Sequence, residues 1–165
     1  MFFVLIVFCV KLCYNIYMEN LYLSPISINE IEILDLTEYN NLTIEKRRLL
    51  VQDSEKEICR GDFFRFYLIK MQDETIGVIN MCGHGTDDIS VAPEIFKDFR
   101  NKGFATKSLN IAYDIAKEKG FKKVIAGIRI ENIASQKLHE KLGFNYEGKF
   151  TSKSGKIMKR YSKLL

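Results

Sequence analysis

The chain has 165 residues, enough for one domain with a hydrophobic core of its own. Hydrophobic residues make up 47% of it and charged residues 28%, which is ordinary for a soluble globular protein. The formal net charge of +4 is mild: it permits an anionic small ligand but does not indicate nucleic acid, so no nucleic-acid partner is expected.

The first 17 residues are predicted to lie outside the folded domain. Residues 2–10 are an unbroken apolar run, shorter than the roughly 20 residues that span a bilayer. No basic residue precedes the run and no A-x-A-like site follows it, so it is a poor signal peptide. Three interpretations of residues 1–17 stay open: an anchor facing a membrane, a segment packed on the domain, or a non-native extension, because Met18 is a plausible start. The domain itself is predicted over residues 18–165.

Cysteine usage indicates a reducing compartment. Cys9, Cys13, Cys59 and Cys82 form no C-x-x-C pair, and neither histidine completes a zinc-site pattern with them. We therefore expect reduced thiols in a cytoplasmic protein, with no metal site and no membrane partner.

The pattern of apolar residues predicts a strand, two helices, three strands, a helix, a strand, a helix and two strands. The ranges in chain order are 21–26, 27–36, 41–53, 63–71, 75–82, 89–96, 104–119, 121–130, 132–141, 144–151 and 156–164. Pro93 suggests an interruption, an edge or a bulge in the strand that contains it. This order predicts one mixed α/β (α+β) domain, with a mostly antiparallel central sheet flanked by helices.

A basic, glycine-containing turn precedes the helix at 104–119. The first backbone N–H groups of a helix have no intrahelical partners, and the helix dipole favours an anion there. Gly103 removes a Cβ that would obstruct a ligand or disfavour a positive φ. The turn therefore predicts a phosphate site, although a tight turn with no ligand would have the same sequence. Its predicted binding residues are Arg100, Asn101, Lys102, Gly103, Phe104, Ala105 and Thr106.

Two motifs give residues 20–165 a resemblance to the GNAT superfamily of acyl-CoA-dependent N-acetyltransferases. The first, Arg100-x-x-Gly103-x-Ala105, matches the R/Q-x-x-G-x-G/A pyrophosphate loop of that family. The second runs from Asn132 to Phe144 (NIASQKLHEKLGF) and is similar to the family segment N-x-x-A/S-x-x-L-Y-E-K-L-G-F. Two separate motifs in this order are far more specific than either alone. The ribosomal-protein acetyltransferases are a looser likeness within the superfamily.

The resemblance implies acetyl-CoA as the ligand of the turn. It also implies that the fourth and fifth strands part to admit the cofactor, here the strand ending at Phe96 and the strand at 123–130. In the family, the residue matching Asn132 contacts the cofactor; the residue also suits a simple helix N-cap. A strand N–H near Ile95 or Phe96 is expected to meet the oxyanion of the reaction.

Two residues are predicted to be catalytic. His139 stands where the family usually has a tyrosine that acts as a general acid, and a histidine can also supply a proton near neutral pH. A structural histidine is the alternative. Glu94, in the strand before the turn, is the best-placed candidate base, with an ordinary exposed glutamate as its alternative and Glu131 as a weaker candidate.

The predicted function is transfer of an acetyl group from acetyl-CoA to a primary amine of a small molecule or a protein. Polyamines, aminoglycosides and amino acids are all compatible small molecules, and homodimer formation is left open. A non-catalytic acyl-CoA-binding or regulatory module on the same fold is the main alternative. A nucleotide-binding protein is a weaker one, because the G-x-x-x-x-G-K-[ST] pattern is absent.

Overall fold

The computed structural model describes residues 20–152 and 154–165, so the interpretations of residues 1–17 lie outside the described residues. The strands are β1 (Leu21–Pro25), β2 (Ile58–Cys59), β3 (Asp62–Met71), β4 (Glu74–Gly83), β5 (Asp88–Ile95), β6 (Lys123–Arg129), β7 (Asn145–Thr151) and β8 (Ile157–Leu164). The α-helices are α2 (Ile44–Glu55), α3 (Phe104–Glu118) and α4 (Ile133–Lys141), and the 3-10 helices are η1 (Ile28–Leu36), η2 (Glu38–Asn41) and η3 (Lys97–Phe99).

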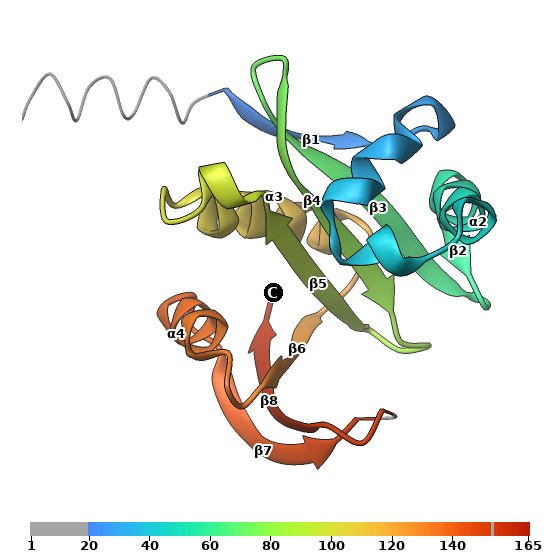
Figure 1. The fold of residues 1–165 in the computed structure, drawn as a ribbon. Helices are drawn as coiled ribbons and strands as arrows, with labels where there is room; N and C mark the ends of the chain where they lie inside the picture. Colours follow the sequence, from blue (N-terminus) through green and yellow to red (C-terminus); the bar gives the residue numbers. More distant parts are fainter. Residues whose placement is uncertain (1–19, 153) are drawn as a thin grey trace, which may run out of the picture.

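The predicted fold class is confirmed: one mixed, mostly antiparallel sheet is flanked by helices (Figure 1). The strand order is β1-β3-β4-β5-β6-β8-β7, with β2 paired to β3, and β5–β6 is the parallel pair within it. The expected helix at 27–36 forms as a 3-10 helix. The two-residue strand β2 was not predicted, because so short a segment leaves no periodic pattern.

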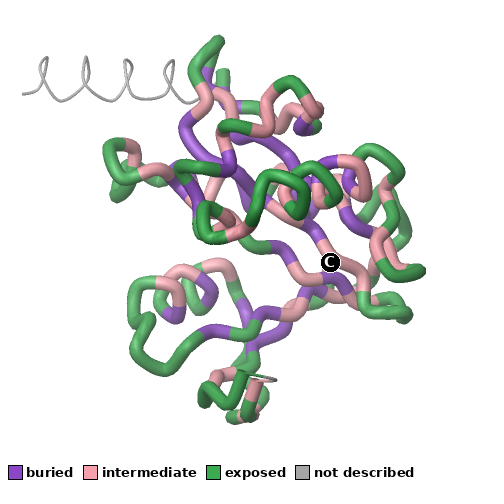
Figure 2. The backbone as a smooth tube through the Cα atoms, turned by 45° about the vertical axis from the view of Figure 1, so that its right-hand side comes forward, coloured by how far each residue is buried: buried purple, intermediate pink, exposed green. Residues whose placement is uncertain are grey.

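The helices cover the two faces of the sheet separately. On one face, α3 places Phe104, Leu109 and Ala112 against a buried core that extends to Phe144 beside α4. On the other face, η1 and α2 pack Leu34 and Val51 onto β3 and β4. Figure 2 shows the buried backbone concentrated along the strands between these layers. None of the described helices is long and apolar enough to cross a membrane.

Strands β5 and β6 part after three residue pairs. Their parallel register joins residues 88–90 to residues 123–125 and goes no further. Strand β5 nevertheless continues to Ile95, paired throughout with β4, so the expected interruption near Pro93 does not occur. Pro93 has no N–H to donate, and it lies where β5 has lost its β6 neighbour.

At Gly77 of β4, beside this opening, the backbone of β5 leaves no room for a side chain. A Cβ on Gly77 would lie 2.4 Å from the carbonyl oxygen of Glu94, which only glycine avoids. The Phe96 N–H also donates to the Ile76 carbonyl at 2.9 Å. The side of β5 that faces β4 is therefore fully engaged, and its other side is left open where β6 diverges.

Candidate active site

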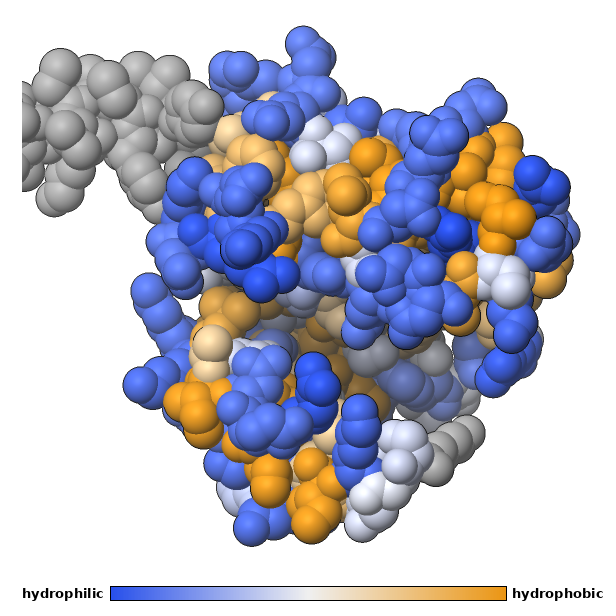
Figure 3. Space-filling view, in the orientation of Figure 1, coloured by the Kyte–Doolittle hydropathy of each residue, from blue (hydrophilic) through white to orange (hydrophobic). Residues whose placement is uncertain are grey.

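Two cavities meet at the point where β5 and β6 part. The first, of about 720 Å³, is lined by Glu38, Pro93, Glu94, Ile95, Phe99, Arg100, Asn101, Gly103, Phe104, Ala105, Thr106, Arg129, Asn132, Ala134, Ser135, Leu138 and His139. The second, of about 670 Å³, is lined by His84, Ser90, Val91, Ala92, Pro93, Ile125, Ala126, Gly127, Ile128, Ser135, His139, Phe150 and Arg160. Both contain Pro93, Ser135 and His139. Figure 3 shows the surface hollowed here, between the body of the sheet and the part formed by α4 and β7.

The start of α3 forms one wall of the first cavity. Gly103 is the N-cap residue, with φ 81°, and no side chain caps this terminus. Asn101 also has a positive φ, of 62°, so the turn places two residues in the left-handed region. The N–H groups of residues 104–106 precede the first intrahelical bond, from the Lys107 N–H to the Gly103 carbonyl. They are therefore available to an anion in the cavity.

Arginine side chains add positive charge to the same cavity. Arg100 donates from Nε to the Ile95 carbonyl at 2.8 Å, which fixes its guanidinium against the open side of β5. Arg129, at the end of β6, lines the opposite wall and was not predicted. Lys102 points elsewhere: its ammonium donates to the Asp98 carbonyl at 2.9 Å and lies over the Phe99 ring.

The start of α4 closes the cavity from the β6 side. Asn132 caps this helix by accepting from the Ser135 N–H at 3.1 Å. Gln136 is buried, and its Nε2 donates to the carbonyls of Arg129 and Ile130 while its Oε1 accepts from the Lys159 ammonium. These bonds fix the end of β6 to α4 and β8, and so hold the wall on which Asn132 and His139 sit.

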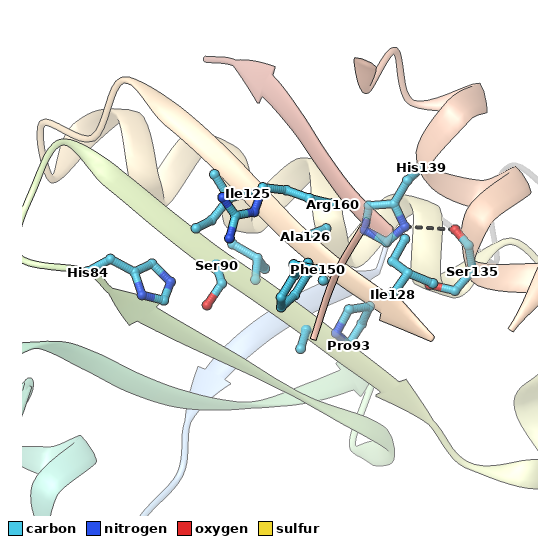
Figure 4. Close-up of a pocket in the computed structure, with 13 residues that line it drawn as sticks. His84, Ser90, Pro93, Ile125, Ala126, Ile128, Ser135, His139, Phe150 and Arg160 are labelled. Carbon is cyan, nitrogen blue, oxygen red and sulfur yellow. Dashed lines mark hydrogen bonds between the residues drawn. The ribbon is translucent and has the colours of Figure 1, made fainter. Parts of the chain in front are cut away.

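The geometry of His139 determines its tautomer. The ring is 5% exposed and stacks edge-on against Phe144, with ring centres 4.9 Å apart. Its Nδ1 lies 2.8 Å from the Ser135 carbonyl oxygen, which can only accept, so Nδ1 carries the proton. The other nitrogen, Nε2, has no hydrogen-bond partner among the described residues, and Figure 4 shows it turned away from Ser135.

Burial lowers the pKa of His139 from its usual 6.5, because the apolar surroundings disfavour the imidazolium more than the Ser135 carbonyl stabilises it. The ring is therefore neutral at neutral pH, with a lone pair on Nε2. In this state His139 can accept a proton at the junction of the two cavities. To act as the predicted general acid, His139 would first have to take up a proton at Nε2, because the resting ring carries its only proton on Nδ1.

Glu94 also lines the first cavity, but its carboxylate already has a structural partner. Its Oε2 accepts from the Glu38 N–H at 3.1 Å, at the first residue of η2. An acid at this position stabilises the helix start and ties η2 to β5. Glu131, the weaker candidate, pairs instead with Arg129 at 3.9 Å on the exposed surface and does not line the cavity.

The second cavity passes from the α4 side of the sheet to the opposite face. Ala126, Ile128 and His139 line it on the α4 side, within or beside the core that contains α3. On the other face, the Phe150 ring lies over Gly127, where a Cβ would come within 3.1 Å of its Cζ. The Arg160 guanidinium lies 4.9 Å from the centre of the Phe150 ring.

Comparison with known proteins identifies this architecture. Residues 35–145 match the family model described as an acetyltransferase (GNAT) domain. The chain belongs to the GNAT family. It is an N-acetyltransferase, and it transfers an acetyl group.

Among the proteins similar to this GNAT protein, the two solved structures are named for different acceptors. The SPbeta prophage-derived uncharacterized N-acetyltransferase YokL of Bacillus subtilis is 28% identical over 139 residues, covering 79% of this chain and 78% of that protein. RimL, a ribosomal L7/L12 alpha-N-protein acetyltransferase solved with coenzyme A, superposes with a TM-score of 0.75 at 19% identity, covering 88% of this chain and 94% of that one. The spermidine N-acetyltransferase of Vibrio cholerae, a dodecamer, superposes with a TM-score of 0.74 at 17% identity, also covering 88% of this chain and 94% of that one.

Most of the predicted site residues of this GNAT enzyme lie around one cavity. Those lining it are Glu94, Ile95, Arg100, Asn101, Gly103, Phe104, Ala105, Thr106, Asn132 and His139. Lys102 and Phe96 are outside the lining, and the Phe96 N–H is used by β4 and so cannot meet an oxyanion. The Ile95 peptide, one residue earlier, faces away from β4 by strand alternation.

Sequence reasoning missed Arg129, Ser135, Phe150 and Arg160. A signal was present for Ser135 alone, which occupies a position of the second motif. Among residues 20–152 and 154–165, no three His, Cys, Asp or Glu side chains gather in a way that could hold a metal ion.

Proposed function

We propose that this GNAT enzyme transfers acetyl from acetyl-CoA to a primary amine, by direct attack of the amine on the thioester. The observation that carries the proposal is the uncapped start of α3, which opens into a cavity that continues through the parted strands to a second cavity. The coenzyme A complex of RimL supports acetyl-CoA as the donor. The acceptors named for RimL and for the spermidine enzyme are both amines, one on a protein and one on a small molecule.

The residues of the first cavity suit coenzyme A. The free N–H groups of residues 104–106 would hold a pyrophosphate, with Arg100 and Arg129 supplying positive charge. The Ile95 peptide would extend the β5 edge toward the pantetheine arm, as in the addition of a strand. Acetyl-CoA supplies an acetyl group activated as a thioester, and the residues shared by the two cavities would surround that group.

We assign His139 the transfer of a proton between acceptor and leaving group. Nε2 accepts the proton that the amine loses as its C–N bond forms. It then returns the proton to the departing thiolate as the C–S bond breaks, so the imidazole ends neutral and the products are an amide and a thiol. Burial makes the imidazolium a stronger acid than usual, and a thiolate of pKa about 8.5 accepts its proton readily.

The test is an acceptor screen in which release of the coenzyme A thiol is followed with acetyl-CoA and a panel of amines. We expect thiol release that depends on at least one amine, with the acetylated product identified by mass spectrometry. Acetyl-CoA that binds tightly but is not turned over with any amine would contradict the proposal, and would favour a non-catalytic acyl-CoA-binding module. If calorimetry showed that ATP binds more strongly than acetyl-CoA, the assignment of acetyl-CoA as the donor would be wrong.

A further inference from the structure

The second cavity differs from the first in having no acid in its lining and a cation on the side away from α4. None of its 13 lining residues is Asp or Glu. The charged group is the Arg160 guanidinium, joined by the imidazole of His84 and the hydroxyl of Ser90. Figure 4 shows His84 and His139 at opposite ends of the cavity, with Phe150 and Arg160 between them.

Arg160 is positioned but not neutralised. Its guanidinium stacks on the Phe150 ring, which fixes its direction, and no carboxylate of the described residues pairs with it. The neighbouring Lys159 lies on the opposite face of the sheet, where its ammonium donates to Gln136 of α4. Because side chains alternate along a strand, Arg160 and not Lys159 faces the second cavity. A planar guanidinium held this way presents free donors to a carboxylate.

The lining between His139 and Arg160 is apolar. Ala126, Ile128, Pro93 and Phe150 form the middle, so a bound molecule would cross an apolar stretch between the proton-accepting His139 and the cationic Arg160. This arrangement suits an acceptor whose amine and whose anionic group are separated by a short carbon chain. It opposes an acceptor with a second ammonium, which would be placed near Arg160 with no acid to receive it.

We propose that the acceptor is an amine that also carries a carboxylate, bound with its amino group at His139 and its carboxylate at Arg160. This inference rests on the proposed acetyl transfer and narrows its acceptor. The carboxylate can belong to a free amino acid or to the acidic second residue of a peptide with a free N-terminus. The proposal excludes polyamines as acceptors, although spermidine is the acceptor named for the structurally similar enzyme of Vibrio cholerae.

The experiment compares acceptors of equal length and opposite far-end charge. γ-Aminobutyrate is paired with putrescine, and δ-aminovalerate with cadaverine, in the full-length enzyme with saturating acetyl-CoA. The dipeptide amides Ser-Glu and Ser-Lys test the peptide source in the same way. We take whichever class, free amino acids or peptides, is acetylated faster. In that class we expect kcat/KM to be at least about tenfold higher for the acceptor with a carboxylate than for its cationic partner, which is roughly 1.4 kcal/mol.

Charge reversal at Arg160 supplies the decisive variant. Arg160→Gln should lower kcat/KM for the carboxylate acceptor about tenfold, and Arg160→Glu should shift the acid-to-diamine ratio about a hundredfold toward the diamine. The matched control is Lys149→Gln, which removes a positive charge from an exposed position of β7 outside both cavities and should leave the ratio unchanged.

Binding separates failure of this inference from failure of the proposed function. With coenzyme A bound, NMR titration of the same acids and diamines measures acceptor binding without turnover. Carboxylate binding that weakens in Arg160→Gln supports the inference even if no amine is acetylated. Turnover with a preference for diamines overturns the inference while leaving acetyl transfer intact. A ratio insensitive to Arg160→Glu, or no binding of any carboxylate amine, overturns it as well.

Discussion

The two cavities are built from different parts of the chain. The first depends mainly on backbone: the free N–H groups at the start of α3, the Ile95 peptide and two residues of positive φ. The second depends on side chains from β5, β6, β7, β8 and α4, with Phe150 and Arg160 on the side away from α4. A backbone site recognises a group that does not vary, whereas a side-chain site can change its acceptor by single substitutions. We infer that donor and acceptor recognition are separable in this enzyme.

The largest effect is expected on the donor side. Gly103→Glu places a side chain and a negative charge where the pyrophosphate would bind, and should weaken acetyl-CoA binding more than about a hundredfold by calorimetry. Gly120→Glu is the control, since Gly120 lies at the other end of α3 with φ 89° and open space around it. Both variants carry similar backbone strain of about 1 kcal/mol and should lose a similar few degrees of melting temperature. Equal acetyl-CoA affinity in the two would refute the loop assignment.

His139 lies where the two cavities meet, and its substitution should affect chemistry without affecting either binding step. His139→Phe is expected to lower kcat about a hundredfold and to leave acetyl-CoA affinity within about twofold. The ratio of wild-type to variant kcat, in which the acceptor's own ionisation cancels, should rise with pH and level off above the lowered pKa of His139. A ratio that falls as pH rises through that pKa would indicate a general acid instead.

The same burial has a consequence for stability. Because the pKa in the folded protein lies below 6.5, the unfolded chain binds more protons at His139 than the folded one. The contribution of this group is therefore fully present above pH 6.5 and is lost as pH falls through the folded pKa. Urea unfolding across this range should show a free energy that declines toward acid more steeply in the wild type than in His139→Phe.

An acceptor-side substitution should leave the donor side unchanged. Gly127→Val pushes against the Phe150 ring and narrows the second cavity, so KM for the acceptor should rise about tenfold while acetyl-CoA affinity stays constant. Ile157→Val, at an exposed position of β8, is the matched control. A parallel loss of acetyl-CoA affinity in Gly127→Val would show that the two cavities are not separable.

The smallest effect is expected at Glu94. Glu94→Gln keeps an oxygen that can accept from the Glu38 N–H, so kcat should change by less than about threefold. Steady-state rates at saturating substrate are sufficient to measure it. A loss of about a hundredfold with normal folding would instead make Glu94 the base and reduce His139 to a positioning role.

The donor side could be predicted from sequence because its residues are contiguous. The turn at residues 100–106 and the segment from Asn132 to Phe144 each carry their own local signal, from glycine, caps and helical spacing. The motif could not show that the Lys102 side chain points away from the cavity, because its direction depends on the Asp98 carbonyl and the Phe99 ring.

The acceptor side could not be predicted in the same way. Phe150 and Arg160 reach the cavity only through the pairing of β7 with β8 and of β8 with β6, which joins residues far apart along the chain. Lysines and arginines are frequent in the last 20 residues, so nothing in the sequence distinguishes Arg160 from its neighbours. The tautomer of His139 likewise depends on a carbonyl one helical turn away, and on burial by Phe144.

Pro93 has a consequence beyond its own strand. A sheet that opens in its middle exposes an edge, and such an edge can recruit a strand from another molecule or close again on its former neighbour. Pro93 lies on the open side of β5 without an N–H to offer, so neither event can complete its ladder of hydrogen bonds there. The gap between β5 and β6 is thus kept available in the free protein, and the enzyme need not separate paired strands each time it binds a new donor.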